Sequence, residues 1–212
     1  MKNSTEKEQK IVRRDSLPPG GVKMLEAMRS LLGEKEFNAI TTAEIASVSK
    51  VNEALIYKYF GSKRGLLHSV LFDCLDGFLT GSQSKLKGIK GTPEKLRKLI
   101  WEHINLYVKE PLIGKILILE ARNYPGFFDS GVYGIIRDYT HEVRAIVEEG
   151  IRKGEIRKDI PSWTIVRVMM GAIEHVCLPK VIFGREVSSD DQADRIFNIV
   201  FGGVAGSGRA DR

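Results

Sequence analysis

Cysteine is scarce in this 212-residue chain, which contains only Cys74 and Cys177, at positions far apart in the sequence. The two residues belong to no CxxC or Cys/His pattern, so the sequence shows neither a zinc-binding motif nor a disulfide framework. We therefore expect two reduced, buried thiols in a cytosolic protein, and we expect no metal and no cofactor.

Long apolar runs are also absent from the sequence. The most apolar stretch, residues 112–119, is interrupted by Gly114 and Lys115, whereas crossing a bilayer takes about 20 predominantly apolar residues in succession. The N-terminal segment MKNSTEKEQKIVRRD is charged throughout and lacks the apolar centre of a secretory signal. We expect a cytoplasmic protein without membrane contact.

Catalytic signatures are missing as well. The sequence contains no HExxH, GxSxG or P-loop pattern, and its four histidines, His68, His103, His141 and His175, are scattered. We therefore predict that the protein is not an enzyme and has no catalytic residues. Turnover of an acyl thioester by the pure protein would revive the enzyme hypothesis.

The composition allows a substantial core and a basic surface. Hydrophobic residues make up 42% of the chain, which is enough to fill the core of a globular protein. Lys and Arg (33) outnumber Asp and Glu (27), which gives a formal net charge of +6. This excess permits a polyanionic partner, although a generally basic surface explains it equally well.

Helical periodicity dominates the sequence, and no alternating apolar pattern with a hairpin turn is evident. We therefore predict an all-α fold, with flexible tails at residues 1–17 and 204–212 and a linker over residues 77–91. Thr92 is expected to cap the helix that follows this linker. Helices are predicted over residues 18–33, from residue 41 onward, and over residues 92–110, 112–123, 127–153, 162–183 and 190–201.

The segment of residues 41–67, TTAEIASVSKVNEALIYKYFGSKRGLL, predicts two short helices joined by a tight turn. Thr41 and Glu44 form a capping box that starts the first helix. Because the turn at residues 49–52 contains no glycine, we expect Lys50 to adopt a left-handed conformation at a cost of about 1 kcal/mol. Asn52 then caps the second helix, and Ser62 caps a further helix.

The helix after this turn is predicted to have two distinct faces. An inward stripe is formed by Ile56, Tyr59 and Phe60, which recur at helical spacing. The outward face is short and polar, and consists of Glu53, Ala54, Tyr57 and Lys58. Such a face suits the major groove of DNA, where the first residues of a recognition helix approach base edges and later ones reach phosphates.

This segment resembles the helix-turn-helix of the TetR family of transcriptional regulators, whose pattern is roughly T-x-x-x-I-A-x-x-A-G-V-S-x-x-x-L-Y-x-Y-F-x-S-K-x-x-L. The matching positions are Thr42, Ile45, Ala46, Val51, Ile56, Tyr57, Tyr59, Phe60, Ser62, Lys63, Leu66 and Leu67. The chain departs from the pattern at Lys50, which replaces the usual turn glycine, and at Asn52, which replaces a serine. The resemblance covers residues 18–70.

The resemblance implies a three-helix DNA-binding domain over residues 18–80, followed by a larger effector-binding and dimerisation domain over residues 85–203. The residues expected to contact double-stranded operator DNA are Thr42, Ala43, Lys50, Asn52, Glu53, Ala54, Leu55, Tyr57, Lys58, Tyr59 and Lys63. Glu53 could accept a hydrogen bond from a cytosine amino group. The alternative for Tyr57 and Tyr59 is that both are simply packing aromatics.

For the remaining helices, the resemblance implies effector binding and a homodimer formed by the last two long helices. The expected dimer surface is the apolar stripe of Val166, Met169, Met170, Ile173, Val176 and Cys177. The same stripe could instead belong to the core of the chain. The candidate effector-binding residues are His103, Tyr107, Glu120, Arg122, Asn123 and Phe127.

The segments LEARNYPGFFD and EEGIRKGEIRKDI resemble family members that respond to fatty acyl-CoA, so an acyl-CoA is one expected effector and an aromatic ligand is the alternative. The predicted function is a repressor that a small-molecule effector releases from a pseudo-palindromic operator. The alternatives are an activator, an enzyme, and a helical interaction protein that has lost DNA binding.

Overall fold

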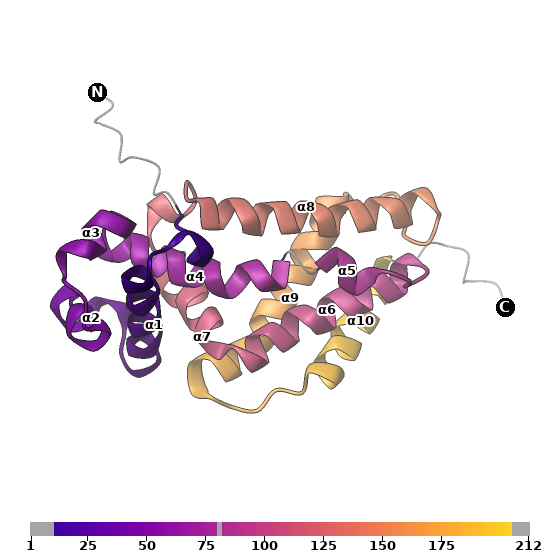
Figure 1. The fold of residues 1–212 in the computed structure, drawn as a ribbon. Coiled ribbons are helices and arrows are strands. Elements are labelled where there is room, and N and C mark those ends of the chain that lie inside the picture. Colours follow the sequence, from indigo (N-terminus) through magenta and orange to yellow (C-terminus); the bar gives the residue numbers. More distant parts are fainter. Residues whose placement is uncertain (1–10, 80–81, 205–212) are drawn as a thin grey trace, which may run out of the picture. The chain divides into compact units, whose positions relative to one another are not determined.

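The computed structural model describes residues 11–79 and 82–204, and within these ranges it contains helices and no strand (Figure 1). The predicted all-α fold is confirmed. The α-helices are α1 (Pro19–Glu34), α2 (Thr42–Ser49), α3 (Ala54–Phe60), α4 (Lys63–Leu79), α5 (Ser82–Leu86), α6 (Thr92–Lys109), α7 (Pro111–Gly114), α8 (Gly131–Arg152), α9 (Ser162–Phe183) and α10 (Ser189–Val204). In the described ranges, no helix has the length and apolarity that a membrane span requires.

The chain divides into two compact units. The first contains Met1–Leu79 and Leu112–Ile136, and the second contains Thr80–Pro111 and Arg137–Arg212. The division predicted from the sequence, a DNA-binding domain over residues 18–80 and an effector-binding domain over residues 85–203, stays a prediction. Residues 112–136 pack in the same compact unit as the helix-turn-helix.

The first unit is built around α1, which packs against α2, α3 and α4. Met28 on α1, Ile45 on α2 and Ile56 on α3 are completely covered by their neighbours. Gly65 permits the close approach of α4 to the end of α3, because a Cβ atom there would lie 2.0 Å from the carbonyl oxygen of Phe60. This packing buries one face of α3.

The turn between α2 and α3 depends on a left-handed Lys50. Its φ and ψ angles are 55° and 38°, and no other non-glycine residue in the described ranges has a positive φ. The amide of Val51 donates to the carbonyl oxygen of Ala46 at 3.1 Å, as in a Schellman motif that ends a helix. The conformation predicted for Lys50 is confirmed, and the turn forms without glycine.

Replacing Lys50 by glycine is expected to raise the free energy of unfolding by about 0.5–1 kcal/mol, because glycine adopts this conformation without a steric penalty. Urea denaturation measures the change. The matched control is Lys58→Gly, which places glycine inside α3 and should lower stability by about 0.5–1 kcal/mol. A Lys50→Gly variant less stable than the wild type would contradict the strain assigned to this turn.

The second unit is organised by α6, α9 and α10, which pack against one another. Val166, Met169, Ile173 and Cys177 on α9 are buried within the chain. The stripe that we expected at the dimer surface therefore belongs to the core, and the prediction is wrong for these four residues. Burial, with a smaller contribution from Glu174, raises the pKa of the Cys177 thiol to about 12.

Several helix boundaries differ from the predicted ones. The expected linker contains α5. Gly91 occupies the cap position of α6, so Thr92 is the first helical residue and does not cap the helix. The helix predicted over residues 112–123 is observed as α7 followed by a π-helix, Lys115–Ala121.

Part of the expected N-terminal tail is packed. Arg14 forms ion pairs with Glu26 and Asp73, so residues 11–17 are anchored to the first unit. At the other end, Val204 is helical and buried. The rest of the two expected tails, residues 1–10 and 205–212, lies outside the described residues.

Candidate nucleic-acid interface and effector pocket

The outward face of α3 is open to solvent. Ala54 and Lys58 are exposed, and Tyr57 retains 55% of its accessible surface. On the opposite face, Ile56 and Phe60 are buried. The two faces predicted from the sequence are therefore present in the structure.

Residues next to this face are either half-buried or exposed. Leu55 and Tyr59 are half-buried, and the Tyr59 ring packs edge-on against Phe60 with ring centres 6.3 Å apart. Lys50 and Asn52, in the turn, are exposed. The exposed polar surface thus begins in the turn and continues along the first residues of α3.

Two side chains determine where α3 and α4 begin. Asn52 Oδ1 accepts a hydrogen bond from the amide of Ala54 at 2.9 Å, and Ser62 Oγ accepts one from the amide of Gly65 at 2.9 Å. The cap at Ser62 was predicted from the sequence. Glu53 occupies the cap position of α3, so Asn52 bonds the first helical residue from one position before the predicted cap. These two hydrogen bonds satisfy amide groups that would otherwise lack a partner in the first turn of each helix.

Thr42 and Glu53 connect the first residue of α2 with the residue that precedes α3. Thr42 Oγ1 donates a hydrogen bond to Glu53 Oε1. Both residues are half-buried, whereas their neighbours Ala43 and Ala54 are exposed. Two of the predicted DNA-binding residues are thus in direct contact.

Lys63 does not extend into solvent. Its ammonium group donates to the carbonyl oxygens of Phe37 at 3.0 Å and Ile40 at 2.6 Å. Burial, together with repulsion from Arg64, lowers the pKa of Lys63. In this structure Lys63 connects α4 to the 3₁₀ helix Phe37–Ala39, which leaves its ammonium group less free to bind a phosphate than we expected.

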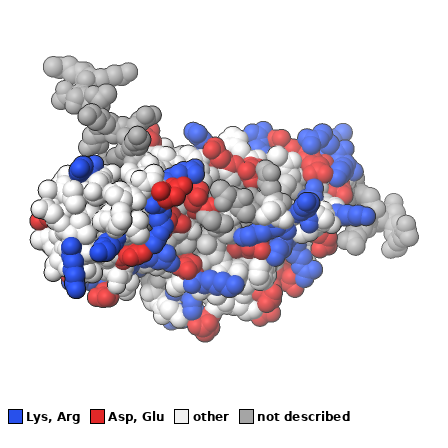
Figure 2. Space-filling view, viewed as in Figure 1, with Lys and Arg blue, Asp and Glu red and all other residues white. Residues whose placement is uncertain are grey.

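The charges on the face drawn in Figure 2 do not by themselves mark an interface. Figure 2 shows Lys and Arg side chains interspersed with Asp and Glu over the visible face of the molecule. The visible face therefore carries charges of both signs. The candidate DNA interface is defined by the turn and by the exposed side of α3.

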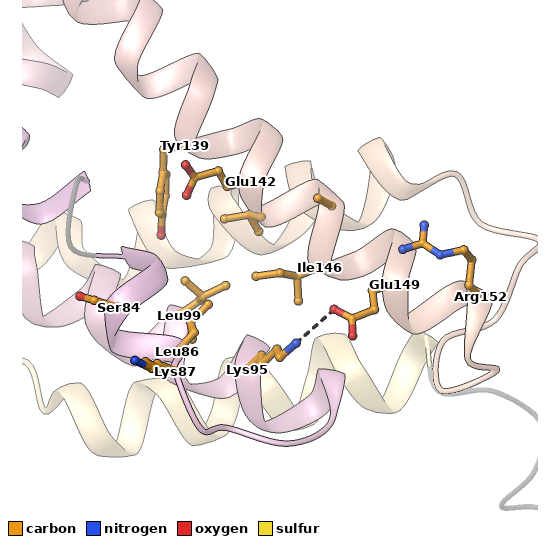
Figure 3. A pocket seen from close by; sticks show the side chains of 12 residues that line it. Ser84, Leu86, Lys87, Lys95, Leu99, Tyr139, Glu142, Ile146, Glu149 and Arg152 are labelled. Carbon is orange, nitrogen blue, oxygen red and sulfur yellow. Dashed lines mark hydrogen bonds and ion pairs between the residues drawn. The ribbon is translucent and has the colours of Figure 1, made fainter.

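The second unit contains an open pocket of about 720 Å³ between α8 and the segment that runs from α5 to α6. This volume lies within the range of roughly 300–1,000 Å³ that is usual for small-molecule sites. Figure 3 shows the two walls of the pocket, which carry Tyr139, Glu142, Ile146 and Glu149 on α8 and Lys95 and Leu99 on α6.

The pocket combines an apolar lining with charged groups. Lys95 pairs with Glu149 at 3.1 Å, and Glu149 also pairs with Lys153. Hydrogen bonds from these two lysines lower the pKa of Glu149 to about 2. Lys87 and Arg152 also line the pocket, and neither forms an ion pair with another described residue.

None of the six candidate effector residues lines this pocket. His103 and Tyr107 belong to the second unit, where their rings stack with centres 5.4 Å apart. Phe127 is buried in the first unit, where its ring lies edge-on to His68. Their role in effector binding stays a prediction.

The other three candidates also belong to the first unit. Burial and a hydrogen bond with Glu36 raise the pKa of Glu120. Arg122 is exposed, as is Asn123, whose side-chain amide donates to the carbonyl oxygen of Leu119. The six residues are therefore divided between the two units rather than gathered in one of them.

Our sequence analysis missed the residues that do line the pocket. A signal was present on α8, because Tyr139, Glu142, Ile146 and Glu149 recur every three or four positions and share one helix face. That face mixes apolar and charged residues. It therefore resembles an ordinary half-exposed helix surface until its neighbours are known.

The left-handed turn, the short α2 and α3 and the exposed side of α3 define a helix-turn-helix protein with a second helical unit. Residues 24–70 match the family described as "Bacterial regulatory proteins, tetR family", and residues 90–178 match "Tetracyclin repressor-like, C-terminal domain". The chain belongs to the TetR family, whose members are transcriptional regulators and not enzymes. The resemblance found in the sequence is confirmed.

Individual relatives agree with this assignment. The fatty acid metabolism regulator protein of Bacillus subtilis (strain 168) is 20% identical over 186 residues, which cover 88% of this chain and 96% of the relative. The structure of FadR from Bacillus subtilis in complex with stearoyl-CoA has a TM-score of 0.77 at 20% identity and covers 86% of this chain and 98% of its own. AibR in complex with isovaleryl coenzyme A and operator DNA has a TM-score of 0.69 at 17% identity, with coverage of 86% and 98%.

Proposed function

We propose that the protein is a cytoplasmic repressor that binds a pseudo-palindromic operator and dissociates from it when a small-molecule effector binds. The observation that carries the proposal is the left-handed turn at Lys50, because this turn presents the exposed start of α3 as a recognition helix. The proposed base contacts are Glu53, Ala54 and Leu55. The proposed backbone contacts are Thr42, Ala43, Lys50, Asn52, Tyr57, Lys58 and Tyr59.

The proposed effector is a fatty acyl-CoA, and the proposed site is the pocket in the second unit. Leu86, Leu99 and Ile146 provide an apolar lining that suits an acyl chain. Lys87 and Arg152 add cations that suit the phosphates of coenzyme A. The acyl-CoA ligands of FadR and AibR, which share this fold, support the choice.

The proposed homodimer uses the exposed side of the last two helices. Val168, Ile182 and Phe183 on α9 and Ile199 on α10 are large apolar residues that remain exposed in the single chain. Burial of such side chains between two copies would be favourable. A dimer would also bring two recognition helices to half-sites one helical turn of DNA apart, or a multiple of it.

Replacing Tyr57 by alanine is expected to weaken operator binding about tenfold, because a hydrogen bond from its hydroxyl to a charged phosphate is lost. Fluorescence anisotropy with a fragment of the protein's own operon region measures the affinity. Phe128→Ala is a suitable control, since Phe128 is a similarly exposed aromatic residue (50%) outside the helix-turn-helix. Equal affinities of Tyr57→Ala and wild type would contradict the proposed orientation of α3.

Replacing Ile146 by tryptophan is expected to raise the stearoyl-CoA concentration needed for operator release at least tenfold. The larger side chain would fill space between α8 and α6, while the helix-turn-helix stays unchanged. A titration of the operator complex with stearoyl-CoA tests this, and operator affinity without effector shows that the variant is folded. Release at the wild-type concentration would exclude this pocket as the effector site.

A further inference from the structure

The hydrogen bond between Thr42 and Glu53 occupies one oxygen of a carboxylate at the edge of the recognition helix. Thr42 Oγ1 donates to Oε1 of Glu53, and no hydrogen bond or ion pair joins Oε2 to another described residue. Glu53 directly precedes α3, next to the exposed Ala54. One acceptor oxygen therefore remains at the position where the proposed function places base edges.

The phosphates of DNA repel a carboxylate in this position, so its hydrogen bond to a base must be well oriented to be favourable. The bond from Thr42 restricts the rotamers of the glutamate and so reduces the entropy that binding must overcome. Because this bond occupies Oε1, only Oε2 is left to accept a hydrogen bond from a base. Thr42 is therefore suited to position Glu53, in addition to the contact with the DNA backbone that is proposed for Thr42 itself.

The bases differ in what they present to a lone acceptor in the major groove. Guanine presents the acceptors N7 and O6, and thymine presents the acceptor O4. Adenine presents the N6 amino donor beside the acceptor N7, which would repel a carboxylate. Cytosine presents the N4 amino donor without an acceptor of its own beside it, so it is the base that a fixed carboxylate oxygen prefers.

We propose that Thr42 and Glu53 form a specificity pair that selects cytosine at one position of each operator half-site. Glu53 Oε2 accepts from the cytosine amino group, and Thr42 is a positioning residue that holds the carboxylate in place. The proposal rests on the proposed DNA-binding function and deepens it. It assigns one base of the recognition sequence to one hydrogen-bonded pair of side chains.

Selection from a randomised duplex DNA library tests the specificity pair, with the full-length wild type and the variants Glu53→Gln, Thr42→Val and Thr42→Ser. The wild type should enrich a palindromic motif with cytosine favoured about tenfold at one position of each half-site. Glu53→Gln should lower the cytosine preference to about threefold or less, because the amide nitrogen that replaces Oε2 can only donate hydrogen bonds, whereas the cytosine amino group needs an acceptor. Thr42→Val should lower the cytosine preference to about threefold or less, and Thr42→Ser, which keeps the hydroxyl, should retain it.

The outcomes separate this inference from the proposed function. If the wild type enriches no motif at all, the proposed function itself fails. If the wild type enriches a motif and Glu53→Gln leaves every base preference unchanged, Glu53 does not select a base and the inference is overturned. It is also overturned if Thr42→Val keeps the full cytosine preference, because Thr42 then has no positioning role.

Discussion

Replacing Ile56 by alanine is expected to lower the free energy of unfolding by about 2–5 kcal/mol and to abolish operator binding. Ile56 is completely buried on the inner side of α3, where the helix packs on α1 and α4. A short helix of seven residues has little stability of its own, so its position depends on this contact. Urea denaturation measures the loss of stability, and anisotropy with the operator fragment measures binding.

Val48→Ala is the matched control for this prediction. Val48 lies on α2 of the same helix-turn-helix but is 49% exposed, so its truncation removes few contacts. We expect a change of at most about 0.5 kcal/mol for the control. An Ile56→Ala variant that is destabilised no more than Val48→Ala would show that α3 is not held by its buried face.

Acidification from pH 7 to pH 4.5 is expected to lower the free energy of unfolding by about 2 kcal/mol through His68 alone. His68 on α4 is 1% exposed, and burial, with repulsion from Arg64, lowers its pKa from 6.5 to about 4. Protonation therefore favours the unfolded state, in which the imidazole keeps its ordinary pKa. The contribution of neutral His68 to the free energy of unfolding is complete above 6.5, the pKa of histidine in the unfolded chain, and is lost as the pH falls towards 4.

His68→Leu isolates this effect from the carboxylates that titrate in the same range. The leucine cannot take up a proton, so the variant should lose about 2 kcal/mol less than the wild type over the same change in pH. Urea denaturation of both proteins at several pH values gives the difference. If both proteins lose the same free energy of unfolding as the pH falls, the pKa of His68 is not lowered in the folded protein.

The helix-turn-helix was predictable because local rules agree there. Thr41 accepts a hydrogen bond from the amide of Glu44 at 3.1 Å, as the capping box implies, and Asn52 accepts one from the amide of Ala54 at the start of the next helix. The left-handed Lys50 followed from the position of the turn, since a left-handed residue is a common way to end a helix and turn the chain. In each case the residues that produce the local structure lie within a few positions of one another in the sequence.

The dimer stripe could not be assigned in the same way. Helical spacing shows that Val166, Met169 and Ile173 share a face of α9, but it does not show which helix covers that face. In the structure α6 and α10 pack against α9, and these side chains are buried in the core. Among the exposed apolar residues, Val168 lies between them in the sequence and Ile182 follows them, and these residues gave no separate pattern.

The environment of Lys63 and the pocket could not be predicted from the sequence, because both depend on contacts between residues far apart in the chain. Lys63 matches the family pattern for a phosphate contact, yet the carbonyl oxygens that bind it belong to residues 37 and 40, far back in the chain. The pocket likewise joins α8 to residues of α6 and the segment around α5. Only the folded arrangement brings these groups together, so spacing along one helix could not identify them.

The most direct test of the account is the affinity of the full-length protein for its selected operator as a function of salt, with and without stearoyl-CoA. A repressor that contacts phosphates should lose affinity as salt rises, with a slope of log K against log salt of about −0.9 for each phosphate contact. Stearoyl-CoA should weaken binding at least tenfold at a fixed salt concentration, which is within the usual range of allosteric coupling of roughly 1–3 kcal/mol. A protein that binds no DNA in a salt-dependent manner, or whose operator affinity is the same with stearoyl-CoA, would contradict the proposed effector-controlled repressor.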